Sequence, residues 1–280
     1  SKGRLYNLPF NMNTFHQLWG VKTPEEARKK IDEQTAPYLK QEAQNLEEQA
    51  LSLAGPDIYE KLIKHYTEKQ WGCSATDLPA STIRRLPFRF RFDNNYFNDR
   101  YQGIPIGGYN VIIDKLLDGI EVKINANFFE NRNEWEMLAD KIVYTGPIDQ
   151  WFECDEGALN YRSLHFENKI LDTRNFQGNA VVNYCDPDPK YTRIIEHKHF
   201  EFGEQDKTVI TYEYSANWKK GMEEYYPINN PENEKIAGSY RPRGKSLKNV
   251  IFGGRLAEYR YYDMHQVIGA ALNQVDKEFT

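Results

Sequence analysis

The spacing of apolar residues changes at Pro87, and this change constrains the fold more than any other feature of the chain. Over residues 58–66 the apolar side chains recur at the interval of an amphipathic helix. Over residues 88–92 three phenylalanines alternate with two arginines, which is the spacing of a strand. The sequence therefore predicts a helical part that ends near Pro87 and a sheet-rich part that follows it.

Helix-start signals are clear before Pro87. Thr23 is followed by a proline and then by Glu26, which together form a capping box with proline at the first helical position. Asn45 and Glu48 repeat the capping signal. We expect one helical domain over residues 20–87, with helix breaks at its glycines.

Alternating patterns dominate the rest of the chain. They predict strands over residues 122–128, 141–145, 161–166, 180–184, 193–200 and 208–214. Residues 229–245 are polar and rich in charge, and we expect a long surface loop there. Near the end, an apolar strand at residues 250–252 leads through Gly253 and Gly254 into an amphipathic helix, an arrangement that suits backbone contact with a cofactor.

Charge and composition narrow the class of protein. The chain has 280 residues and a formal charge of −5, without blocks of like charge, which argues against broad binding to nucleic acid or to a membrane surface. No stretch reaches the roughly 20 apolar residues of a membrane span, and no signal-peptide pattern is present. The 3 cysteines are widely spaced and indicate reduced thiols. We expect a cytoplasmic protein.

Residues 65–101 alternate aromatic rings with fixed cations. Rings stack on flat bases and Arg forks match phosphate oxygens, so this pattern favours a nucleotide or a nucleotide sugar as ligand. Arg84, Arg85 and the distant Arg193 are candidates for a phosphate clamp, although surface arginines are more often simply solvated. Trp71 is a candidate lid, although a tryptophan at a helix end more often packs between domains.

Motifs for other chemistries are missing. His197 and His199 put two imidazoles on one predicted strand face, but no further ligand at metal-binding spacing accompanies them, so we predict no metal. The sequence contains no GxSxG, no Walker A motif and no GxGxxG. No recognisable acid and base pair stands out among the carboxylates.

Five segments resemble one enzyme family. They are LPFNMNTF (residues 8–15), YTEKQWG (66–72), FDNNY (92–96), YTGPID (144–149) and GGRLAEY (253–259). Their sequences and their order are similar to those of bacterial UDP-galactopyranose mutase, and the similarity runs along the whole chain.

The resemblance implies an α+β / α/β multidomain fold. It consists of a helical bundle domain (20–87), an antiparallel β-sheet domain (88–128 and 155–245) and part of a Rossmann-like FAD-binding domain (1–19, 141–150 and 247–280). The family's N-terminal βαβ unit, which carries GxGxxG, would lie upstream of Ser1. We therefore expect this polypeptide alone to bind FAD weakly or not at all and to turn over no substrate.

The resemblance also implies the reaction and its residues. The family interconverts UDP-galactopyranose and UDP-galactofuranose, with N5 of reduced FAD attacking the anomeric carbon while UDP departs, as a step in cell-wall polysaccharide biosynthesis. The implied catalytic residues are Arg85 and Arg193. The implied substrate contacts are Tyr66, Trp71, Tyr96, Arg162, Asn183, Tyr226, Tyr261 and Asp263, and the implied FAD contacts are Gly253, Gly254, Arg255 and Met264. The implied partners are UDP-galactose and a second copy of the chain, with no nucleic acid and no membrane.

Two other interpretations stay open. A non-enzymatic module for nucleotides or single-stranded RNA could use residues 88–101 as a stacking platform. A relative of the flavin amine oxidases would share the FAD-binding segments, but it would not explain the helical part that carries Trp71 and Arg85.

Overall fold

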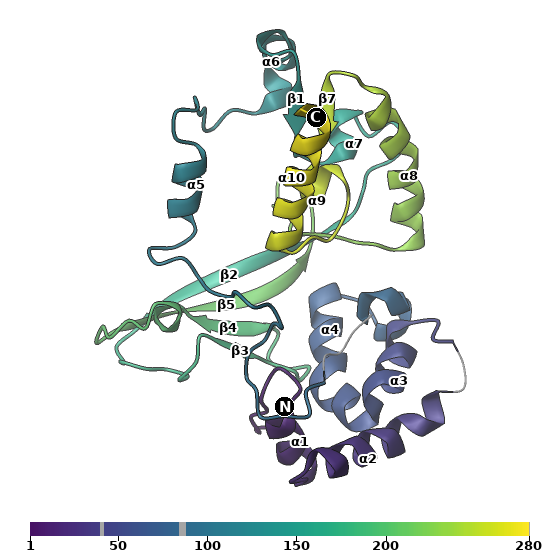
Figure 1. Ribbon diagram of the computed structural model, residues 1–280, viewed down its shortest axis with the longest axis vertical. Helices are drawn as coiled ribbons and strands as arrows, with labels where there is room; N and C mark the ends of the chain where they lie inside the picture. The colour runs from purple at the N-terminus through teal and green to yellow at the C-terminus, as the bar shows by residue number, and fades with distance from the viewer. Residues whose placement is uncertain (40–41, 84–87, 280) are drawn as a thin grey trace. The chain divides into compact units, whose positions relative to one another are not determined.

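The computed structural model describes residues 1–39, 42–83 and 88–279. The chain divides into two compact units, which we describe separately (Figure 1). Unit 1 consists of Ser1–Val111 and Leu164–Ala216, and unit 2 consists of Ile112–Ser163 and Asn217–Thr280.

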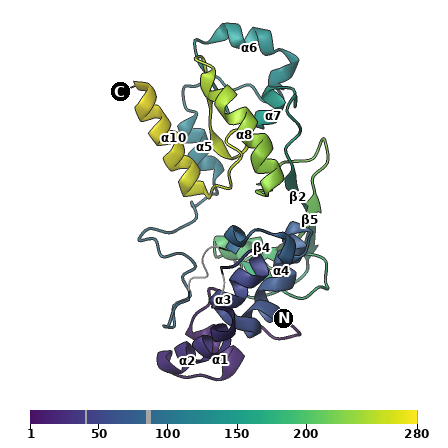
Figure 2. The ribbon, with the colours of Figure 1, turned by 90° about the vertical axis from the view of Figure 1, so that its right-hand side faces the viewer.

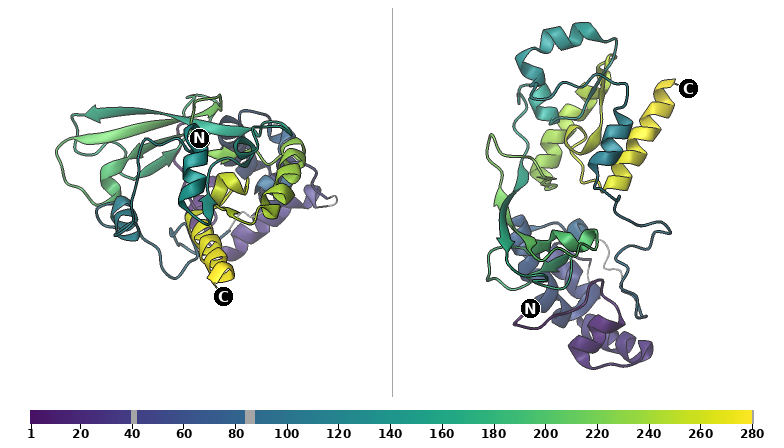
Figure 3. Two further views of the ribbon diagram at one scale, coloured as in Figure 1. Left: turned by 90° about the horizontal axis from the view of Figure 1, so that it is seen from above. Right: turned by 90° about the vertical axis from the view of Figure 1, so that its left-hand side faces the viewer.

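Unit 1 begins with a cluster of helices (Figures 1 and 3). These are α1 (Met12–Trp19), α2 (Pro24–Thr35), α3 (Leu46–Ile58), the π-helical turn η2 (Tyr59–Ile63) and α4 (Lys64–Trp71), with short 3₁₀ turns η1 (Ala36–Tyr38), η3 (Ala75–Asp77) and η4 (Ala80–Ile83). The predicted caps are confirmed: Thr23 and Glu26 form the capping box of α2, and the side chain of Asn45 accepts from the Glu48 N–H at the start of α3.

Apolar residues spaced three and four apart on these helices form one core. Met12, Phe15, Leu46 and Ile58 are each at most 1% exposed. Gly55 interrupts the regular helix with φ +74°, so the predicted break at this glycine is confirmed, although the chain resumes helical geometry directly afterwards. The packing is close here, because a Cβ at this position would lie 2.5 Å from Cβ of Gln34.

A sheet completes unit 1. Its strands follow the order β3 (Val181–Asn183), β4 (Arg193–Glu196), β5 (Thr208–Asn217) and β2 (Tyr161–Leu171), with antiparallel pairing of β3 with β4 and of β4 with β5. The prediction for residues 193–200 is only half right. The strand ends at Glu196 and a 3₁₀ turn, η6 (His197–Phe200), follows, so His197 and His199 do not share a strand face.

Unit 2 is built around a small parallel pair of strands, β1 (Ile142–Tyr144) and β7 (Val250–Phe252). Its other elements are η5 (Phe128–Glu130), α6 (Arg132–Leu138), α7 (Ile148–Trp151), β6 (Tyr226–Pro227), α8 (Pro231–Ser246), α9 (Gly254–Ala257) and α10 (Met264–Phe279), while α5 (Asn110–Leu116) bridges the sequence boundary of the units. Strand β6 pairs with the first residues of β2. Figure 2 shows α8 and α10 as the two long helices of this unit.

The prediction of a loop over residues 229–245 is wrong, because this stretch forms α8. Asn230 caps the helix by accepting from the Asn233 N–H, and Pro231 occupies a first-turn position where its missing N–H costs nothing. Ala237 and Tyr240 are fully buried on one side of α8. Charged residues dominate the composition of this stretch, so its narrow apolar stripe was not recognised from the sequence.

Two predicted strands are also wrong. Residues 122–128 hold no strand and lead only into η5. Residues 88–92 make a single bridge, between Asn11 and Arg89, in place of a regular strand. The sequence also predicts a short helix from about residue 79 to residue 86, closed by Pro87. The structure describes η4 within this range, and residues 84–87 lie outside the described residues.

The described parts of the chain contain no helix that is both long enough and apolar enough to cross a membrane. Helices and strands are both present in quantity, so the fold is a mixed helix and sheet fold.

Candidate functional site

Arg193 lies at the centre of a polar cluster in unit 1. It is the first residue of β4, where it pairs with Asn183 of β3 and Glu213 of β5. Directly opposed residues of antiparallel strands point to the same face, so these side chains form a row across the sheet. Sequence reasoning singled out Arg193 and Asn183, and the strand register brings them together.

Glu213 and Tyr66 both contact the guanidinium group of Arg193. Its Nε lies 3.0 Å from Oε1 of Glu213, and its Nη2 donates to the hydroxyl of Tyr66 at 2.7 Å. Tyr66 lies on α4, 127 positions earlier in the chain. The fold therefore joins the end of the helical cluster to the sheet at two residues that sequence reasoning had assigned separately.

Glu213 is a functional candidate that sequence reasoning missed. Its side chain is only 9% exposed, and its Oε1 also accepts from Oγ1 of Thr192 at 3.1 Å. This buried carboxylate forms an ion pair with Arg193 and keeps its guanidinium group beside the sheet. The signal was available in principle, since alternation predicted both strands, but only the register shows that Glu213 faces Arg193.

Asn183 offers an acceptor beside this arginine. Its Oδ1 is buried and has no hydrogen-bond partner among the described residues. An unpaired buried acceptor costs about 1–3 kcal/mol, so such atoms are uncommon unless a ligand or water satisfies them. The atom is consistent with a polar ligand at this row of the sheet.

Trp71 is the last residue of α4, and Gly72 closes the helix in a left-handed conformation with φ 72°. The ring is partly buried against the core of the helical cluster. The backbone carbonyl of the neighbouring Gln70 accepts from the Ser215 hydroxyl of β5. The structure thus places Trp71 at the end of an anchored helix.

Tyr96 lies in an exposed loop, with 63% of its surface accessible. Arg89 supports this loop: it is 6% exposed, and its Nη2 donates to the Tyr96 carbonyl and to Oδ1 of Asn98, both at 2.9 Å. Arg91 pairs with Asp93 at 2.9 Å. The arginines of residues 88–92 thus contact groups of their own segment.

Arg85, the second predicted clamp residue, lies outside the described residues, as does Arg84.

Unit 2 carries a cluster of tyrosines around Arg255. The rings of Tyr226 and Tyr261 stack with centroids 5.6 Å apart, and the guanidinium carbon of Arg255 lies 4.8 Å from the Tyr261 ring centroid. Arg255 also donates to the carbonyls of Tyr225, at 2.9 Å, and Tyr262. The arginine predicted as an FAD contact is thus the residue that holds this cluster together.

Two further predicted substrate residues lie near this cluster in the fold of unit 2. Arg162 of β2 is 2% exposed. It lies opposite Tyr226 of β6 in the strand register, and its guanidinium group donates to the side chain of Asn217. Asp263 directly precedes α10 and is exposed, and its carbonyl accepts from the N–H groups of Gln266 and Val267, both at 3.0 Å.

Gly253 and Gly254 follow β7 at the end of the parallel strand pair. A Cβ at Gly253 would meet no atom within 4 Å, and Gly254 has φ +89°, a conformation that disfavours other residues. Met264, the first residue of α10, is 63% exposed. This glycine pair leaves open space in which a ligand can approach the backbone, so it fits a cofactor contact, whereas the Arg255 guanidinium group is engaged elsewhere.

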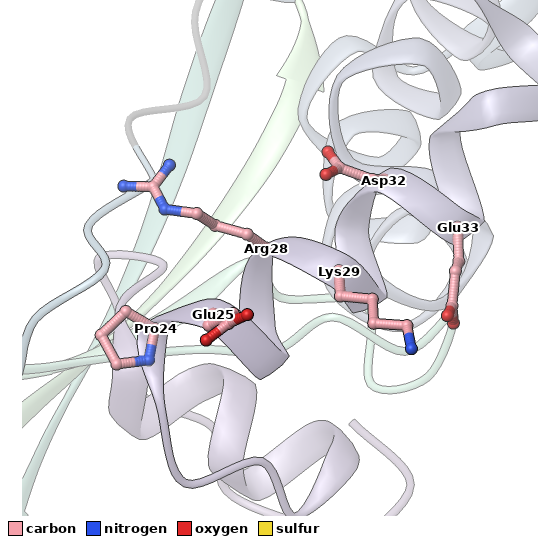
Figure 4. A pocket seen from close by; sticks show the side chains of 6 residues that line it. All are labelled: Pro24, Glu25, Arg28, Lys29, Asp32 and Glu33. Atoms are coloured by element: carbon pink, nitrogen blue, oxygen red, sulfur yellow. The ribbon is translucent and has the colours of Figure 1, made fainter.

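Two hollows of the surface lie apart from these residues. One, of about 580 Å³, lies along α2 and is lined by exposed residues, with Arg28 extending away from Asp32 and Glu33 (Figure 4). The other, of about 790 Å³, lies between residues 104–109 and the segment from His197 to Val209. His197 contacts the Thr211 hydroxyl at 2.6 Å, and the described chain contains no group of three or more His, Cys, Asp or Glu residues that could hold a metal ion.

Comparisons with known proteins agree with the five segments. The family described as GLF, UDP-galactopyranose mutase, matches residues 61–261. A probable UDP-galactopyranose mutase of Klebsiella pneumoniae is 39% identical over 280 residues, covering 98% of this chain and 71% of that protein. A dTDP-fucopyranose mutase of Escherichia coli is 36% identical over 279 residues, covering 97% of this chain and 74% of that protein.

The fold has a counterpart among solved structures. The crystal structure of a reduced UDP-galactopyranose mutase matches with a TM-score of 0.60 at 14% identity, covering 85% of this chain and 69% of that one. The predicted resemblance is confirmed, and the chain belongs to the UDP-galactopyranose mutase family of isomerases.

Proposed function

We propose that this chain binds a UDP-sugar and takes part in the interconversion of UDP-galactopyranose and UDP-galactofuranose. The observation that carries the proposal is the cluster of Tyr66, Arg193 and Glu213, in which a buried carboxylate and a tyrosine hydroxyl hold one guanidinium group at 3.0 and 2.7 Å. An oriented cation beside an aromatic ring suits a ligand that carries a diphosphate and a flat base.

Arg193 has the main electrostatic task in this proposal. When the bond between the sugar and the diphosphate breaks, negative charge grows on the departing UDP, and a cation already held in place stabilises it without reorganisation. The Tyr66 ring stacks on the uracil, which is worth about 1–3 kcal/mol. Asn183 accepts a hydrogen bond from the ligand, Arg85 is the second phosphate clamp and Trp71 covers the bound nucleotide.

For unit 2 we propose that Tyr226 and Tyr261 bind substrate through their hydroxyl groups, as we also propose for Tyr96 of unit 1. Their stacking and the position of Arg255 over the Tyr261 ring restrict both rings before any ligand binds. Restricted donors lose less entropy on binding, which favours affinity. We assign Arg162 and Asp263 supporting roles in substrate binding.

Gly253, Gly254 and Met264 are the residues proposed to contact FAD. The open space at Gly253 supports this assignment. Reduced FAD, when bound, supplies the nucleophile for the anomeric carbon. For Arg255, the structure favours an indirect part, since its guanidinium group donates to two backbone carbonyls of the tyrosine cluster.

The finer domain assignment is also a proposal: a helical substrate domain (20–87), an antiparallel sheet domain (88–128 and 155–245) and Rossmann-like segments for FAD (1–19, 141–150 and 247–280). The parallel pairing of β1 with β7, followed by the glycine pair, supports the last of these. The homodimer, the cytoplasmic location and the role in cell-wall polysaccharide synthesis stay predictions.

Calorimetric titration of the 280-residue chain with UDP tests the proposal. We expect wild-type protein to bind UDP and Arg193→Ala to bind it about 10- to 100-fold more weakly, the loss of one or two charge-assisted hydrogen bonds. Arg174→Ala is the matched control, because this arginine of unit 1 is 69% exposed and its carboxylate partner is 3.9 Å away.

A parallel titration with dTDP addresses the second candidate substrate, which the similarity to a dTDP-fucopyranose mutase raises. Stronger binding of dTDP than of UDP would move the substrate assignment to a thymidine nucleotide. Equal affinities of Arg193→Ala and wild-type protein for both nucleotides would remove the cluster from the site.

A further inference from the structure

Lys69 is half-buried at a point where α4 meets the loop between β3 and β4. Its ammonium group donates to three backbone carbonyls, those of Tyr184 at 2.7 Å, Pro189 at 3.0 Å and Tyr191 at 3.0 Å. An ammonium group has three donors and no acceptor, so these three carbonyls satisfy it completely. The contacts span at least 115 positions of sequence, so Lys69 links distant segments of unit 1.

The loop is shaped around this cation. The Tyr184 N–H donates to the Thr192 carbonyl at 2.9 Å and closes the base of the loop. The loop contains two prolines, which lack N–H groups, and this reduces the number of internal donors for its carbonyls. Carbonyls that converge on one point repel one another unless a cation lies between them. Without Lys69 the loop would lose the group that holds its carbonyls together.

Candidate site residues flank both ends of this contact. On the loop side, Asn183 immediately precedes Tyr184, and Arg193 immediately follows Thr192. On the helix side, Tyr66 lies one turn before Lys69, and Trp71 lies two residues after it. The Lys69 contact therefore joins the two segments between which the hydrogen bond from Arg193 to Tyr66 must form.

We propose that Lys69 is a positioning residue for the nucleotide site: its ammonium group, held by three loop carbonyls, fixes the distance between Tyr66 of α4 and Arg193 of β4. This inference rests on the proposed function of the cluster, and it adds a residue that does not itself touch the ligand. Burial lowers the pKa of this lysine, and the carboxylates of Asp186 and Asp188 are among the charges that counteract burial, as expected for a cation held inside the fold.

The test compares three variants of the full chain. Lys69→Met keeps most of the side-chain volume and removes the donors, and Lys69→Arg keeps the charge but has a planar fork that cannot place three donors at one point. Lys64→Met is the matched control, since Lys64 lies on the same helix and pairs with Glu60 one turn earlier, at 3.3 Å.

Two measurements follow on each variant, UDP affinity by calorimetry and amide hydrogen exchange without ligand. We expect Lys69→Met to weaken UDP binding roughly tenfold or more, because ordering of the site must then occur on binding. We expect faster exchange both in the loop from Tyr184 to Thr192 and in the last turn of α4. Lys64→Met should change neither quantity.

A double variant separates positioning from general stability. If Lys69 acts through Arg193, then Lys69→Met should cost at least threefold less UDP affinity in an Arg193→Ala background than in the wild type, because coupled sites are non-additive. A residue that only stabilises the fold would leave the affinity of the folded protein unchanged in both backgrounds.

The outcomes separate this inference from the proposed function. Absence of UDP binding in the wild type would refute the proposed function, and the exchange data would then decide alone whether Lys69 orders both segments. Wild-type UDP affinity in Lys69→Met, or unchanged exchange in both segments, would overturn the inference. If Lys69→Met does not fold, the UDP affinity of Lys69→Arg is the test. We expect Lys69→Arg to bind UDP at least threefold more weakly than the wild type, and an affinity equal to that of the wild type would overturn the inference.

Discussion

Replacing Glu196 tests the electrostatics of the sheet in unit 1. This carboxylate of β4 is 0% exposed, and it accepts from the N–H groups of Phe176 and Gln177 at 3.0 and 2.9 Å and from the Thr208 hydroxyl at 2.7 Å. Nε2 of His199 lies 3.1 Å away. Burial alone would raise the pKa of Glu196, but these hydrogen bonds outweigh it and lower the pKa to about 2.

The pKa sets both the size and the pH range of the effect. A decrease from 4.5 to about 2 on folding corresponds to about 3 kcal/mol of stability from ionisation of this group. Because the folded-state pKa is the lower one, this stability is present above pH 4.5 and is lost as the pH falls toward 2. At pH 3 only about 40% of it should remain.

Urea unfolding of Glu196→Gln at two pH values measures this contribution. We expect the variant to be about 3 kcal/mol less stable than the wild type at pH 7, and the difference to shrink by about 2 kcal/mol at pH 3. Glu204→Gln is the control, since Glu204 is exposed in the same unit and should change stability by less than about 0.5 kcal/mol. A difference that is equal at both pH values, or no larger than that of the control, would refute the assignment.

Three further substitutions test the backbone and the glycine pair. Gly55→Ala should destabilise unit 1 by about 2–3 kcal/mol in urea unfolding, because φ is +74° and the new Cβ would lie 2.5 Å from Gln34, and a neutral effect would contradict the kink. Asn230→Ala should lower the free energy of unfolding by about 1 kcal/mol, because it removes the cap of α8. Asn229→Ala, which removes no cap, should leave it unchanged. Gly253→Ala should leave stability within about 0.5 kcal/mol of wild type, because space is open there. It should weaken the binding of added FAD, measured by flavin fluorescence, and a variant with the same measurable FAD affinity as wild type would argue against the contact.

Local sequence signals were sufficient to predict several elements of the fold. The cap residues Thr23 and Asn45 were predictable because each cap is made within three residues of sequence. Helix α8 was missed because its buried stripe is narrow: Ala237 and Tyr240 face the core, while charged residues cover the rest. The opposite error occurred at residues 122–128, where a strand was predicted and none forms. Alternation of apolar and polar residues does not make a strand unless a partner strand pairs with it.

The candidate site was harder to predict because its geometry depends on pairing. The residue pattern made Arg193 a clamp candidate and the family resemblance gave Tyr66 a role, but neither predicts the hydrogen bond between them, which spans 127 positions. Glu213 lies in none of the five family segments, and the segment YTEKQWG contains Lys69 without indicating what its ammonium group contacts. The strand register places Glu213 opposite Arg193, and loop carbonyls surround Lys69. Neither relation can be read from a single sequence.

The most direct measurement of the central claim compares UDP with uridine on Arg193→Ala and wild-type protein. If Tyr66 stacks on the base while Arg193 binds the diphosphate, the variant should lose about 10- to 100-fold in affinity for UDP and less than about threefold for uridine. Equal losses for both ligands would show that Arg193 does not act through the phosphates. Unchanged affinity for UDP would contradict the assignment of this cluster as the nucleotide site.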